Sequence, residues 1–88
     1  DTPPLISEAQ LRFSKEMVSL ARECQRLSAN AERVFGNYIK ATCDLNDPTT
    51  IGEAAFLETV REQVTISIAQ AKGTFKHMAK RTHKVLTE

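Results

Sequence analysis

An all-α fold, in which two long antiparallel helices form a helical hairpin, is the fold class that the sequence predicts. Apolar residues recur in steps of three and four through both halves of the 88 residues, and one short segment near residue 47 holds the strongest helix-breaking chemistry. Only three Gly and three Pro leave few other places to turn. We expect a single domain over residues 1–88, with helices over about 6–44 and 50–86 and a loop over about 45–49.

The first predicted helix carries apolar residues at heptad spacing. Ten successive positions form an unbroken apolar series, which is typical of a long helix packed lengthwise on a partner. The series is Phe13, Met17, Leu20, Cys24, Leu27, Ala31, Val34, Tyr38, Ala41 and Leu45. From it we expect Phe13, Leu27 and Val34 to be core residues.

The loop prediction depends on Asp47 and Pro48. Asp47 is a good N-cap, and proline suits the first position of a helix, where its missing N–H costs nothing. Pro48 also disfavours helical geometry at Asp47, so the first helix has to end before it. Asn46 is a candidate for a left-handed residue that closes that helix.

The second predicted helix has a weaker series with the same spacing, in which Phe75 is the expected core aromatic. Its positions are Ala54, Leu57, Arg61, Val64, Ile68, Ala71, Phe75, Met78, Thr82 and Val85, of which two are not apolar. Val60 is placed to replace Arg61 in the contact, while the long arginine side chain reaches the edge. Gly36 and Gly73 mark either a close helix approach or tolerated surface positions.

A lone hairpin buries only one face of each helix, so apolar side chains on the flanks stay partly in contact with water. These flank residues form the expected apolar interaction surface: Leu11, Val18, Phe35, Ile39, Phe56 and Ile66. Their burial requires another surface, because two helices alone bury too little to order about 80 residues. We therefore expect self-association into a dimer or tetramer, as a four-helix bundle or coiled-coil oligomer.

Charge is segregated along the second half of the chain. Residues 44–62 hold five acidic side chains and one basic, a net charge of −4, whereas residues 63–88 hold five basic and one acidic, a net charge of +4. The cations form a basic stripe of Lys72, Lys76, Lys80, Arg81 and Lys84. The stripe suits either a solvated helix face that complements the helix dipole or a candidate anion-binding surface. Nucleic acid is an unlikely partner, because no aromatic residue is available among the cations for base stacking.

No residue pattern indicates catalysis, a cofactor or a metal. Cys24 and Cys43 are 19 residues apart in one helix, about 28 Å, so they cannot form a disulfide within the chain, which favours a cytoplasmic location. His77 and His83 point to different faces, so a metal site is not expected. Arg61 is the one enzyme-like feature, but a phosphate or dicarboxylate site needs several convergent cations. No stretch is apolar enough to span a membrane.

From residue 46 onward the chain resembles the second long helix of phasins, the small proteins that coat polyhydroxyalkanoate granules in bacteria. The residues that carry the resemblance are Asp47-Pro48-Thr49, Glu53, Phe56-Leu57, Val60, Gln63 and Gln70-Ala71-Lys72. The two cysteines and the regular heptad spacing depart from the family pattern. The resemblance implies a non-enzymatic amphipathic coat protein that shields a hydrophobic polyester, often self-associates and lies on the granule surface in the cytoplasm.

The residues themselves leave two function classes open. An amphipathic rod suits a coat that covers a hydrophobic polymer surface. The same features suit a protein-interaction module, a scaffold or chaperone that binds partner helices in its groove. An enzyme ranks well behind both.

Overall fold

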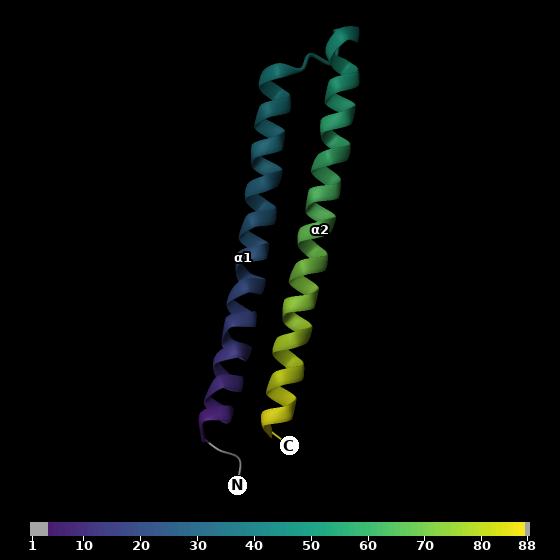
Figure 1. The fold of residues 1–88 in the computed structure, drawn as a ribbon. Coiled ribbons are helices and arrows are strands. Elements are labelled where there is room, and N and C mark those ends of the chain that lie inside the picture. The colour runs from purple at the N-terminus through teal and green to yellow at the C-terminus, as the bar shows by residue number, and fades with distance from the viewer. Residues whose placement is uncertain (1–3, 88) are drawn as a thin grey trace.

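The protein is a helical hairpin, and the computed structural model describes residues 4–87, with side-chain exposure for residues 8–83. Helix α1 spans Pro4–Thr42 and helix α2 spans Pro48–Thr87. The two helices run antiparallel side by side, joined at one end by the short loop (Figure 1). The Cα positions extend over 70 × 15 × 13 Å. The all-α hairpin predicted from the sequence is confirmed.

The loop is fixed by two side chains. The Asp47 carboxylate accepts hydrogen bonds from the backbone N–H of Thr49 at 2.9 Å and from its hydroxyl at 2.8 Å, which makes Asp47 the N-cap of α2. The Thr50 hydroxyl donates to the carbonyl of Asp44 at 2.8 Å and accepts from its N–H at 2.9 Å. Helix α1 thus ends without a left-handed residue, and the expectation for Asn46 is wrong because Asp44 and Thr50 close the turn instead.

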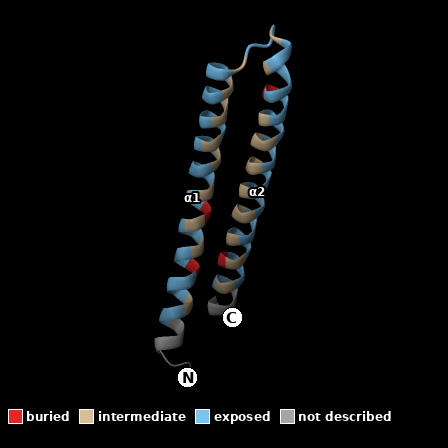
Figure 2. Ribbon diagram, turned by 45° about the horizontal axis from the view of Figure 1, so that its top comes forward, coloured by how far each residue is buried: buried red, intermediate tan, exposed pale blue. Residues whose placement is uncertain are grey.

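Small residues form the centre of the hairpin interface. Only Ser14, Ala21, Ala54 and Ala79 are buried among the residues whose exposure is described, and each is exposed by 8% or less. Figure 2 shows the buried and half-buried positions along the facing sides of the two helices. The Ser14 hydroxyl donates to the carbonyl of Ala79 at 3.2 Å. Short side chains let the two backbones approach closely at these positions, so bulky residues lie to either side.

The predicted series on α1 is therefore only half right. Met17, Leu20, Cys24 and Ala31 of the series are half-buried, but Ser28 and Phe35 face α2 in place of Leu27 and Val34. The predicted core residues Phe13, Leu27 and Val34 are exposed by 41%, 54% and 51%. Tyr38, Ala41 and Leu45 of the series are exposed as well. The physical reason is that α1 turns toward α2 the positions one residue further along the chain, of which Ser14, Ala21 and Ser28 are small and Phe35 is the exception.

The predicted series on α2 lies along α1 as expected. Every described member is buried or half-buried, including Phe75 and Thr82, while the side chain of Val85 lies outside the described residues. The Thr82 hydroxyl donates to the carbonyl of Met78 at 2.8 Å, which satisfies a polar group at an apolar position. Val60 and Arg61 are both half-buried, so Val60 accompanies Arg61 without replacing it.

Candidate functional site

A row of large apolar residues on α1 lies beside the hairpin interface and is mostly exposed within the described part of the chain. We call Phe13, Leu20, Leu27 and Val34 the α1 row; they are spaced seven residues apart, so they follow one line along a slightly supercoiled helix. Leu20 is half-buried and the other three are exposed. A row of this kind is what one coiled-coil helix presents to another.

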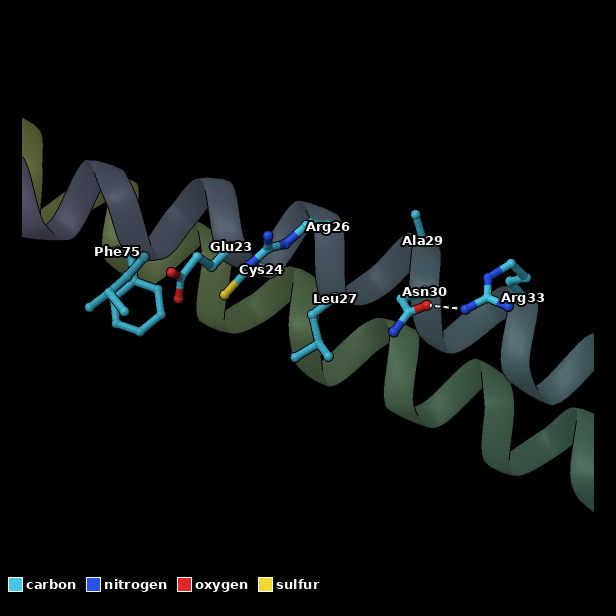
Figure 3. A pocket seen from close by; sticks show the side chains of 9 residues that line it. Glu23, Cys24, Arg26, Leu27, Ala29, Asn30, Arg33 and Phe75 are labelled. Atoms are coloured by element: carbon cyan, nitrogen blue, oxygen red, sulfur yellow. Dashed lines mark hydrogen bonds between the residues drawn. The ribbon is translucent and has the colours of Figure 1, made fainter.

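The middle of the α1 row borders an open groove of about 810 Å³. Leu20, Leu27 and Cys24 of α1 and Phe75 of α2 form its apolar part. Charged and polar residues complete its lining: Glu23, Arg26, Asn30 and Arg33. Figure 3 shows Phe75, Cys24 and Leu27 following one another along the groove, and Ala29 also belongs to its lining. The groove is thus an apolar strip with a charged rim.

The expected apolar interaction surface does not form one patch. Leu11, Val18, Phe56 and Ile66 are exposed, as the expectation required. Phe35 and Ile39 are instead half-buried, because α1 turns them toward α2. Phe56 and Ile66 are ten residues apart on α2 and therefore point in different directions. Among the large exposed apolar residues are Phe13, Leu27 and Val34 of the α1 row, which the sequence pattern assigned to the core.

The basic stripe is joined by a cation from the other helix. Lys72, Lys76, Lys80 and Arg22 of α1 line a groove of about 290 Å³, whose remaining residues are Val18, Ala21, Gln25 and Ala79. The Lys72 ammonium donates to the Gln25 side-chain oxygen at 3.1 Å. Arg81 is exposed, and the side chain of Lys84 lies outside the described residues. Arg22 and Gln25 could not be assigned from the sequence, since that required knowing which face α1 turns to α2.

Arg61 bridges the two helices. Its guanidinium donates to the backbone carbonyl of Glu32 on α1 at 2.8 Å and forms an ion pair with Glu58 at 3.3 Å. Gly36 leaves the space for it, because a Cβ at position 36 would lie 3.1 Å from Arg61 Nη2. Arg61 Nε is buried without a hydrogen-bond partner. The side chain is therefore used in a structural contact between the helices, and Gly36 marks a close approach whereas Gly73 is open to solvent.

Other titratable groups are scattered. Cys24 and Cys43 are both free thiols, and His77 and His83 are exposed. No group of three or more His, Cys, Asp or Glu side chains within the described part of the chain is placed to hold a metal ion. The pKa of Asp47 is lowered from its usual 3.8, chiefly by the hydrogen bond from the Thr49 backbone and then by the one from its hydroxyl. Over the described residues, neither helix is apolar enough to cross a membrane.

The chain matches no protein-family model, no curated protein and no solved structure. The functional argument therefore rests on the geometry of the α1 row and its groove.

Proposed function

We propose that this protein is a non-enzymatic interaction module that binds a helix of a protein chain along the α1 row. The observation that carries the proposal is the contrast between two sides of α1. Ser14, Ala21 and Ser28 face α2, while Phe13, Leu27 and Val34 are about half exposed. Exposed apolar residues gathered on one line of a soluble domain are typical of a binding surface.

The spacing of the row favours a helix as the partner. Side chains seven residues apart stay on one line of a slightly supercoiled helix and fit into the gaps between side chains of a second helix, which is the packing of coiled coils. The groove between Leu27 and Phe75 extends this row with an apolar floor. Binding to a flat surface without regularly spaced side chains does not require this heptad spacing.

Photo-cross-linking in cells tests the proposal. Benzoylphenylalanine at position 27 should yield covalent products that mass spectrometry maps to helical protein segments. The matched control is benzoylphenylalanine at position 11, because Leu11 is exposed to a similar degree but lies off the α1 row. Absence of products from position 27, or products from position 11 alone, would reject the assignment of the row.

A second candidate function is the phasin-like coat on a polyhydroxyalkanoate granule. It is favoured by the exposed apolar residues outside the row, which leave no side of the rod fully polar: Leu11, Val18, Ile51, Phe56 and Ile66. A rod with apolar residues on several sides can lie on a hydrophobic polymer and displace interfacial water along its length.

Partitioning onto polyhydroxybutyrate particles tests the coat function. Binding driven by apolar burial should persist at 1 M salt, where the Debye length falls to about 3 Å. It should be lost when Leu11, Val18, Phe56 and Ile66 are replaced by polar residues, and kept when Lys72, Lys76, Lys80 and Lys84 are replaced by Gln. Binding that collapses with salt and depends on the lysines would instead indicate an anion-binding surface.

A further inference from the structure

Four charged residues beside the middle of the α1 row change sign at its midpoint, while a further cation, Arg12, lies beside Phe13 at the start of the row. Glu16 and Glu23 accompany the first half of the row, and Arg26 and Arg33 accompany the second. Glu23, Arg26 and Arg33 line the same groove as Leu27, and Glu16 lies one heptad before Glu23. None of these four residues forms an ion pair within the described chain. The rim therefore presents two carboxylates and two guanidinium groups that are available to another surface.

The order of these charges is self-complementary in one orientation. A two-fold axis that passes beside α1, level with the midpoint between Glu23 and Arg26, is also level with the midpoint between Glu16 and Arg33. Such an axis, set across the rod, places each carboxylate opposite a guanidinium group of a second, antiparallel copy. It falls within about one residue of the midpoint between Phe13 and Val34, so the apolar row is centred on the same point. A parallel pair of α1 helices would place Glu16 on Glu16 and Arg26 on Arg26.

Along the chain, α2 also changes from acidic to basic. Its loop-proximal part carries most of the acidic segment 44–62, with a net charge of −4, and its far part carries segment 63–88, with a net charge of +4. When α1 lies on α1 of the antiparallel copy, α2 lies on α2 of that copy with opposite direction. The acidic part of each then faces the basic part of the other, which favours this orientation over one with the loops at the same end.

The exposed area of the hairpin is large enough for such an interface. A compact monomer of this mass exposes about 5,200 Å², whereas the hairpin exposes 6812 Å². The excess is about 1,600 Å² for each chain, and a standard stable interface buries about 800 Å² on each partner. The excess is therefore about twice the area that a stable interface with a second hairpin needs.

We infer that the α1 row is covered by the α1 row of a second copy of this chain, running antiparallel, so that two hairpins form a four-helix dimer with their loops at opposite ends. The inference rests on the proposed function and identifies its partner. Apolar burial along the row stabilises the dimer, and the rim charges select the antiparallel orientation.

Charge reversal on the rim tests the contact. One variant, Glu16→Lys with Glu23→Lys, has an entirely basic rim, and another, Arg26→Glu with Arg33→Glu, has an entirely acidic rim. Each alone should raise the dissociation constant of the dimer roughly tenfold or more at low salt, because attraction becomes repulsion at four symmetric contacts. An equimolar mixture of the two should restore association. Sedimentation equilibrium at micromolar concentration is the measurement.

The control carries the same change of net charge away from the groove. Glu8→Lys with Glu32→Lys should associate like the parent, since the proposed axis places Glu8 opposite Ala41 and Glu32 opposite Met17, neither of which is charged. Equal loss in the control and the rim variants would overturn the assignment of the interface. A parent chain that stays monomeric to 100 micromolar would overturn the dimer itself.

The orientation has its own measurement, made possible by Cys43 near the loop. In a Cys24→Ser chain labelled with a nitroxide at Cys43, the antiparallel dimer should give a spin–spin distance of about 55 Å, since each label lies about 18 residues from the axis. Loops at the same end would bring the labels within roughly 25 Å of each other, because adjacent helix axes are 8–10 Å apart, and that result would reject the antiparallel arrangement. Excess unlabelled protein should abolish the signal.

These outcomes are separable from the test of the proposed function. A monomeric parent whose position 27 cross-links to a helix of a different protein would reject the second copy and keep the interaction module. A chain that gives no product at position 27 and does not associate would reject both.

Discussion

At the residue scale, Gly36 and Arg61 are explained by their contact with each other. Arginine at an apolar position of α2 reaches across to the Glu32 carbonyl, and glycine on α1 keeps a side chain out of its path. In the sequence the two residues are 25 positions apart and neither suggests the other. Gly73 has no such neighbour, so its presence in α2 costs stability without a compensating contact.

The first prediction compares the two glycines. Gly73→Ala should raise the free energy of unfolding by about 0.5–1 kcal/mol, because alanine is the better helix former and nothing obstructs its Cβ. Gly36→Ala should gain less, since the Arg61 guanidinium has to move by a few tenths of an ångström. Urea unfolding followed by circular dichroism measures both. If the contact is responsible, the two gains become equal in an Arg61→Ala background; unequal gains there would refute the explanation.

The second prediction concerns pH and Asp47. The Thr49 hydrogen bonds lower the pKa of the folded carboxylate below 3.8, so the folded state binds fewer protons than the unfolded state in this range. The stabilisation is fully present above that pH and is lost as the pH falls through the folded pKa. Asp47→Asn removes the titration and keeps a capping side chain. The stability difference between parent and variant should therefore be constant above about pH 5 and shift against the parent below pH 3.8. A difference independent of pH would contradict this.

At the element scale, α2 was predictable and the facing side of α1 was not. Helix α2 has one apolar line, and it faces α1. Helix α1 has two adjacent lines that share Met17, Cys24 and Ala31, one continued by Leu20 and Leu27, the other by Ala21 and Ser28. Hydrophobicity favours the line with the larger residues as the side that faces α2, but the line with the smaller residues permits closer approach of the two helices. A sequence pattern shows that both lines exist without showing which one faces the partner within the chain.

The ambiguity over which line of α1 faces α2 also explains why the candidate site could not be predicted. The pattern assigns the α1 row to the core because its residues are large and apolar, and it does not reveal that Arg22 shares a groove with Lys76, which depends on the rotation of α1. The loop was more accessible to sequence reasoning, since Asp47 and Pro48 act through local geometry. The loop conformation depends on residues that are neighbours in the sequence, whereas the rotation of α1 about its axis depends on the packing of both helices.

The third prediction tests which side of α1 holds the hairpin together. Ala79→Leu should lower the free energy of unfolding by about 1–3 kcal/mol, because a larger side chain at this buried position forces the helices apart. Leu27→Ala should cost less than the 2–5 kcal/mol typical of a buried leucine, since Leu27 is 54% exposed. Both are measured by chemical unfolding of the dilute chain. A larger loss at Leu27 than at Ala79 would restore the large residues to the core.

At the scale of the whole molecule, the hairpin is an extended rod with little interior. Its radius of gyration is 19.9 Å, against about 12 Å for a compact chain of this length. No described side chain of the hairpin is fully buried. Burial within one chain is thus small compared with the conformational entropy of ordering two long helices, and further burial between chains has to contribute to the stability of the fold.

The last prediction follows from that coupling of folding to association. The Tm of the parent should rise by roughly 5–10 °C as the concentration increases a hundredfold, since a hundredfold change in concentration is worth about 2.7 kcal/mol and is spread over the unfolding entropy of two chains. Leu27→Gln with Val34→Gln should lower the Tm and remove this dependence, because the polar groups cannot be buried on a second copy without hydrogen-bond partners. Leu11→Gln with Val18→Gln, off the α1 row, should keep it. Circular dichroism at 222 nm over a dilution series measures the Tm of each chain. A parent Tm that does not change with concentration would show that the single hairpin is stable alone. The exposed α1 row would then serve a purpose other than self-association.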